Sequence, residues 1–132
     1  MPEPSPAAAR RWQKLVSLAE TEVQATLAAL PAELQAEARK LPITYEPKPS
    51  RLLRDDDVDE DTLGLFIGEE WSASEAGNTT LPPQIMLFLE NLWDFAERHE
   101  DIYRDEVRTT LLHELGHYLG LDEGELEQRG LE

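Results

Sequence analysis

Two histidines and a glutamate near the C-terminal end have the types and the spacing of a metal-dependent hydrolase. The stretch reads His113-Glu114-Leu115-Gly116-His117, an H-E-x-x-H pattern. On a helix, residues four positions apart lie on one face, so both imidazoles can bind one metal ion. In hydrolases of this kind the glutamate takes a proton from the attacking water. The spacing therefore predicts His113 and His117 as metal ligands and Glu114 as the catalytic base.

The residues around the motif are patterned as an amphipathic helix. Its apolar arc lies opposite the histidines and consists of Val107, Leu111, Leu112, Leu115, Tyr118 and Leu119. Small residues flank the histidines, namely Thr109, Thr110, Gly116 and Gly120. We expect the helix to bury its apolar face in a core and to present the histidines to a cleft. Glu114 falls about 60–100° from the two histidines, beside a metal ion rather than as its ligand.

Gly120 is predicted to end this helix in a sharp turn, because glycine adopts positive φ without strain. A catalytic zinc ion takes three protein ligands and one water. The spacing after Gly120 makes Glu123 the first choice for the third ligand. The alternatives that stay open are Asp122, Glu125 and Glu127. A solvated acidic tail would also account for any one of these carboxylates taken alone.

The motif and its surroundings resemble the small bacterial zincin-like metallopeptidases, whose motif is His-Glu-x-x-His-x-x-Gly-x-x-Asp. Similar segments outside the motif are residues 63–68, 81–88 and 125–130, so the resemblance spans roughly residues 30–130. Two positions depart from the family pattern. Glu123 stands where the family has aspartate, and Tyr118 stands where a histidine often follows the second ligand.

The resemblance implies an α+β fold, a minimal zincin with a small twisted sheet of three or more strands. The sheet would pack against an N-terminal helix and the helix that carries the motif. It also implies zinc-dependent peptide hydrolysis, with one zinc ion held by His113, His117 and Glu123. In such folds a strand beside the motif helix pairs with the substrate backbone. Residues 84–88 and 63–67 are the candidates for that strand, and 84–88 is preferred.

The local patterns agree with this fold class. Ser5 and Pro6 predict a helix start, and apolar residues at spacings of three and four continue to Leu30-Pro31. Further predicted elements are a helix over 32–40, strands over 42–47 and 63–67, and a helix ending near Glu100. The prolines at 42 and 47 place that strand at a sheet edge. Periodicity alone does not distinguish a strand from a buried helix over 84–88, and the resemblance favours a strand there. Asp101 or Asp105 is expected to cap the motif helix.

Residues 48–62 are predicted to form a loop that contains an acidic run. Asp55, Asp57 and Asp59 alternate as in a calcium-binding loop. However, Glu60 replaces the turn glycine, and Phe66 stands where the bidentate glutamate belongs. A solvated loop is therefore favoured over a calcium site.

Composition bounds the remaining possibilities. The 132 residues suffice for one domain over 1–132, with residues 1–6 expected to form a disordered lead. There is no cysteine, so a metal site must use histidine and carboxylate. No signal peptide and no apolar run of membrane-spanning length is found, so we expect a cytoplasmic protein that does not enter a membrane.

The net charge of −16 opposes nucleic acid and anionic membranes as partners and favours basic ones. The expected substrate is a peptide or unfolded protein, with basic sequences favoured. The oligomeric state is left open. Two alternatives also stay open: an inactive metal-binding interaction module, and a hydrolase of a non-peptide substrate. Tyr45, Tyr103 and His99 are candidates for binding the oxyanion by residue type alone.

Overall fold

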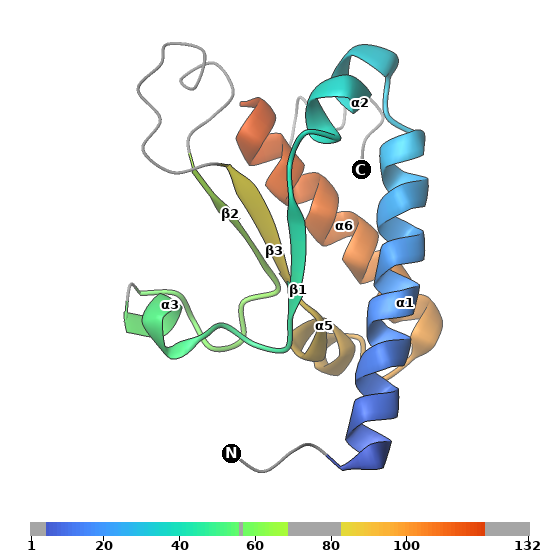
Figure 1. The fold of residues 1–132 in the computed structure, drawn as a ribbon, viewed down its shortest axis with the longest axis vertical. Coiled ribbons are helices and arrows are strands. Elements are labelled where there is room, and N and C mark those ends of the chain that lie inside the picture. Colours follow the sequence, from blue (N-terminus) through green and yellow to red (C-terminus); the bar gives the residue numbers. More distant parts are fainter. Residues whose placement is uncertain (1–4, 56, 69–82, 121–132) are drawn as a thin grey trace.

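The computed structural model describes residues 5–55, 57–68 and 83–120. In chain order the elements are α1 (Pro6–Ala28), α2 (Ala32–Ala38), β1 (Ile43–Glu46), α3 (Arg51–Asp55), β2 (Gly64–Ile67), β3 (Gln84–Phe88), α5 (Leu89–Phe95) and α6 (Glu100–Leu119). Helices and a small mixed sheet make an α+β fold, as predicted (Figure 1). The helix that carries the motif is α6.

Helix α1 begins where the sequence predicts. The Ser5 side chain accepts a hydrogen bond from the Ala8 N–H at 3.1 Å, and Pro6 occupies the first helical position. These two residues therefore belong to the start of the helix rather than to the predicted disordered lead; residues 1–4 lie outside the described part of the chain. The helix buries one stripe, formed by Leu15, Ala19, Val23, Thr26 and Leu27.

The sheet has the strand order β1-β3-β2. Strand β1 runs parallel to β3, and β2 runs antiparallel to it. The predicted edge position of the proline-flanked strand is confirmed. The preference for residues 84–88 as the substrate-pairing strand is wrong, because β3 is the central strand and both its edges are already paired. Within the described residues, the strand with an open edge beside the motif helix is β2.

Three local predictions differ from the structure. The expected loop over 48–62 contains the short helix α3. The helix expected to reach Glu100 stops at Phe95, because Glu97 and Arg98 adopt left-handed backbone conformations with φ of 55° and 61°. Helix α6 begins directly after His99, and no side chain caps it. Asp101 lies in its first turn, where a carboxylate still interacts favourably with the helix dipole.

The core lies where α6 packs between the sheet and α1 (Figure 1). Tyr103 is fully buried there, and its hydroxyl donates a hydrogen bond to the Leu15 carbonyl at 2.8 Å. Its ring meets the edge of Trp93 at a centroid distance of 5.6 Å. This anchors the first half of α6 to α1 and α5, so the second half is held at a fixed place beside the sheet.

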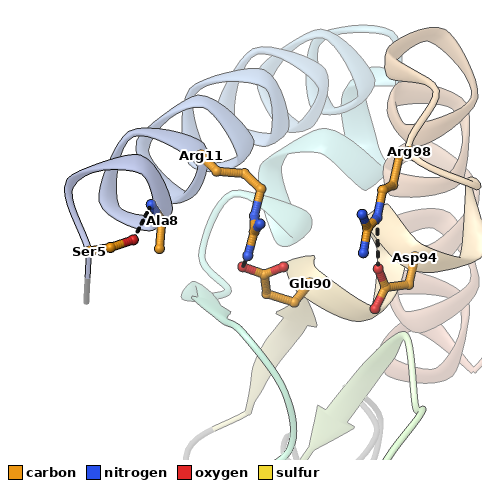
Figure 2. A network of polar contacts seen from close by, with 6 residues as sticks. All are labelled: Ser5, Ala8, Arg11, Glu90, Asp94 and Arg98. Atoms are coloured by element: carbon orange, nitrogen blue, oxygen red, sulfur yellow. Dashed lines mark hydrogen bonds and ion pairs between the residues drawn. The ribbon is translucent and has the colours of Figure 1, made fainter. Parts of the chain in front are cut away.

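Ion pairs tie the outside of this core together (Figure 2). Arg11 on α1 contacts the Glu90 carboxylate on α5 at 3.2 Å, and Arg98 contacts Asp94 at 3.7 Å. Both arginine side chains are well exposed, so each pair contributes little to stability. The described helices include none with the length and apolar character needed to cross a membrane.

Candidate metal and catalytic site

The last turns of α6 separate a buried face from an exposed one, as the sequence predicts. Val107, Leu111, Leu112, Leu115 and Tyr118 are all buried. On the other side, 46% of the His113 side chain and 53% of the His117 side chain are exposed. The apolar contacts therefore fix the helix, while both imidazoles reach solvent.

The two imidazoles are close enough to share a metal ion. Their ring centroids are 4.7 Å apart. Within the described part of the chain, His113, Glu114 and His117 form the one group of three potential ligands, with ligand atoms within 4.8 Å of one another. Two ligand atoms on a tetrahedral zinc lie about 3.3 Å apart, from bond lengths near 2.0 Å. Small rotations of exposed imidazoles close that difference, so the residues fit a metal ion such as zinc.

Glu114 differs from the histidines because it is almost fully buried. Only 9% of its side chain is exposed. Its Oε1 accepts a hydrogen bond from the Phe66 N–H at 2.9 Å. The same oxygen lies 3.4 Å from His117 Nδ1, and Oε2 lies 4.0 Å from His113 Nε2. The carboxylate is thus fixed between the two histidines and strand β2.

Strand β2 contributes to the site through contacts with α6 that sequence reasoning did not assign. It approaches α6 closely at Gly64, where an added Cβ would lie 2.5 Å from Thr110 Cγ2. Two residues on, the Phe66 ring packs against Tyr118 at a centroid distance of 5.7 Å. The signal in the sequence is Gly64 itself, since a glycine inside an apolar strand often marks a close backbone approach.

Gly120 ends α6 in the left-handed conformation, with φ of 72°, which confirms the prediction. Its N–H donates to the His117 carbonyl at 3.3 Å. The helix therefore ends three residues after His117. The candidates for the third ligand, Glu123, Asp122, Glu125 and Glu127, lie outside the described residues, so that assignment stays a prediction.

The three oxyanion candidates do not lie beside the motif. The Tyr103 hydroxyl is engaged by Leu15 in the core, and burial raises its pKa. His99 precedes the opposite end of α6, about 20 Å from His113 along the axis. Tyr45 lies on β1, which β3 separates from β2. Burial, and to a smaller extent Glu20, raises the pKa of Tyr45.

The acidic stretch does not gather a metal site in the described part of the chain. Asp55 closes the short helix α3, and Asp57 has a left-handed φ of 69°. Asp55, Asp57 and Asp59 do not form a close group of ligands among the described residues. The preference for a solvated loop over a calcium site stays a prediction, and part of the segment is helical.

The comparisons with known proteins bear on the same residues. A search of curated proteins gives no match. The family model described as zincin-like metallopeptidase matches residues 38–131, a range that contains the whole sheet, α6 and the motif. This match covers more than half of the chain, so the chain belongs to the family of zincin-like metallopeptidases.

Proposed function

We propose that this protein is a zinc-dependent peptidase in which Glu114 is the catalytic base. The observation that carries the proposal is the contrast within one turn of α6. Two exposed imidazoles lie on either side of a carboxylate that is 9% exposed and tied to a backbone amide. Membership in the metallopeptidase family supports the same assignment.

The proposed roles follow from the chemistry of each group. His113, His117 and Glu123 hold one zinc ion. When bound, zinc polarises the scissile carbonyl and lowers the pKa of water at the site to about 7. Glu114 accepts the proton of the attacking water and later passes it to the leaving amine. These residues need no cysteine and no second cofactor.

An extended peptide is the proposed substrate. Strand β2 has an open edge in the described structure, and it lies against α6 beside Glu114. Because Glu114 takes the Phe66 N–H, a peptide that adds to this edge as a further strand would pair with the other outward-pointing groups of Gly64 and Phe66, which would bring its backbone to the histidines. The net charge of −16 favours basic peptides over acidic ones.

The test compares Glu114→Gln with the wild-type chain. Glutamine keeps an oxygen that can accept the Phe66 N–H but cannot take a proton. Zinc content and melting temperature should stay nearly unchanged. Cleavage of a peptide library that includes basic sequences should fall about a hundred- to ten-thousand-fold. Glu106→Gln, on the same helix, is the matched control and should cleave as wild type does.

The other outcomes separate the alternatives. Stoichiometric zinc binding by a wild-type chain that cleaves no peptide would make the protein a metal-binding interaction module. Equal cleavage by wild type and Glu114→Gln would remove Glu114 from the mechanism, and a contaminating protease would then have to be excluded first.

A further inference from the structure

We propose that the backbone N–H of Phe66 is a positioning group for Glu114, so that strand β2 supplies part of the catalytic machinery. The proposal rests on the proposed function, because it concerns the base of that reaction. The carrying observation is the 2.9 Å hydrogen bond from the Phe66 amide to Oε1 of a carboxylate that is 9% exposed.

The direction of this amide follows from the register of β2 on β3. The Phe88 N–H donates to the Leu63 carbonyl at 3.0 Å, which makes Leu63 and Phe88 a hydrogen-bonded pair. In an antiparallel ladder such pairs alternate with pairs that do not exchange hydrogen bonds. Phe66 is paired with Ile85 in the non-bonded position, so its N–H points away from β3. The amide is available to Glu114 without loss to the sheet.

The strand is fixed on both sides of this amide. Gly64 allows β2 to approach Thr110 so closely that an added Cβ would lie 2.5 Å from its methyl group. The Phe66 ring then packs against Tyr118. Together these contacts hold the Phe66 N–H at one place along α6, opposite Glu114.

The carboxylate needs such support, because a buried charged group is costly without hydrogen bonds. Phe66 holds Oε1, which also lies 3.4 Å from His117 Nδ1. This leaves Oε2, 4.0 Å from His113 Nε2, as the oxygen that accepts the proton from water. A charge-assisted hydrogen bond to a carboxylate is stronger and shorter than a neutral one, so it fixes orientation well.

The first experiment removes this backbone N–H and leaves every side chain unchanged. A backbone ester at residue 66 replaces N–H with oxygen and keeps the phenyl ring. We expect kcat to fall about ten- to hundred-fold, the worth of a hydrogen bond to a charged group. KM and zinc content should stay near the wild-type values.

A backbone ester at Tyr45 is the matched control. The Ile85 N–H donates to the Pro42 carbonyl, and orientation alternates along a parallel strand, so the Tyr45 N–H also points away from β3. The Tyr45 ester weakens β1 in the same way that the Phe66 ester weakens β2. It should leave kcat unchanged.

The second experiment needs no catalysis. Labelling phenylalanine with ¹⁵N gives three amide signals, since the chain contains three phenylalanines. In Glu114→Ala, the Phe66 amide proton should shift upfield and exchange with solvent faster. The Phe88 and Phe95 amides serve as internal controls and should not change.

The outcomes are distinct. An unchanged kcat in the Phe66 ester overturns the proposal. So does a Phe66 amide proton whose chemical shift and exchange rate are the same in Glu114→Ala as in wild type. A raised KM with unchanged kcat also overturns it, because the amide would then serve the substrate rather than the base. A wild-type chain that cleaves no peptide overturns the proposed function instead, and the labelled amide still reports whether Phe66 holds Glu114.

Discussion

The two edges of the sheet are built differently. Strand β1 is bracketed by Pro42 and Pro47, which have no N–H, and it exposes Thr44 and Glu46 on the open face. Strand β2 contains no proline and directs an N–H of its open edge to Glu114. Open edges invite unwanted pairing with other chains, and prolines and charges suppress it. Among the described residues, the edge away from the motif is therefore blunted by prolines and a charge, whereas the edge beside the motif directs a backbone N–H to Glu114.

This comparison teaches where to look for chemistry in a small sheet. Apolar residues of both strands pack half-buried against the core, namely Ile43 and Tyr45 on β1 and Phe66 on β2, so these core contacts do not distinguish the two edges. The backbone does, because one edge is protected and the other donates to a buried carboxylate. If the chemistry belongs to the β2 side, substitutions there should change zinc binding or cleavage, and substitutions elsewhere should not.

The largest effect is expected from the two histidines that flank Glu114. His113→Ala or His117→Ala should remove most bound zinc, because a site with one imidazole lacks half of the histidine ligands. His99→Ala, at the start of the same helix, is the matched control and should bind zinc normally. Metal analysis of purified protein checks this. Equal zinc content in all three variants would show that His113 and His117 are not the zinc ligands.

The next effect concerns the close approach of β2 to α6. Gly64→Ala places a Cβ against Thr110 Cγ2 at 2.5 Å, so the strand must move. We expect a loss of about 1–3 kcal/mol in stability. Activity should fall about ten-fold, since the Phe66 amide moves with the strand.

Thr110→Ser provides the rescue for that variant. Serine lacks the methyl group, so the double variant Gly64→Ala/Thr110→Ser should recover most of the stability and activity. Thermal unfolding and peptide cleavage measure both. A Gly64→Ala protein with wild-type melting temperature and activity would show that β2 need not lie so close to α6.

A smaller effect is expected at the end of α6. Gly120→Val forces a β-branched residue into φ of 72° and should cost about 1 kcal/mol or more. It should also weaken zinc binding, because the proposed third ligand, Glu123, follows Gly120 by only three residues in the sequence. Gly120→Asn, which tolerates the left-handed conformation, is the control and should lose less. Equal stability of the two variants would contradict this account.

The smallest effect is expected near the start of α6, at the opposite end of the helix from the motif. Tyr103→Phe removes one buried hydrogen bond to Leu15 and should cost about 1 kcal/mol. Activity per folded molecule should not change. A fall in activity would indicate that Tyr103 takes part in catalysis.

The same variant has a pH signature. Burial raises the pKa of Tyr103, so the fold favours its neutral form. That stability is fully present below the unfolded pKa of about 10 and is lost as pH rises above it. Tyr103→Phe should lose stability less steeply than wild type above pH 10.

The sequence predicted the elements better than their arrangement. Apolar periodicity and Gly120 located α6 and its end, because local patterning decides those features. The strand over 84–88 was correct in extent, but its central place was not predictable, since pairing depends on contacts distant in sequence. The role of Phe66 could not be predicted from residue types, because the atom involved is a backbone N–H whose direction depends on register.

The close pairing of β2 with α6 depends on two repeat lengths that nearly agree. Gly64 meets Thr110 and Phe66 meets Glu114, so the strand and the helix run in the same direction. Two strand residues advance about 6.8 Å, and four helix residues advance about 6 Å. The mismatch of under about 1 Å is small over one step but grows with each further step. A strand of four residues is therefore short enough for its residues to stay opposite their partners on the helix. A slip of β2 by one residue along α6 would place Leu65 or Ile67 opposite the base, and the N–H groups of these residues point toward β3.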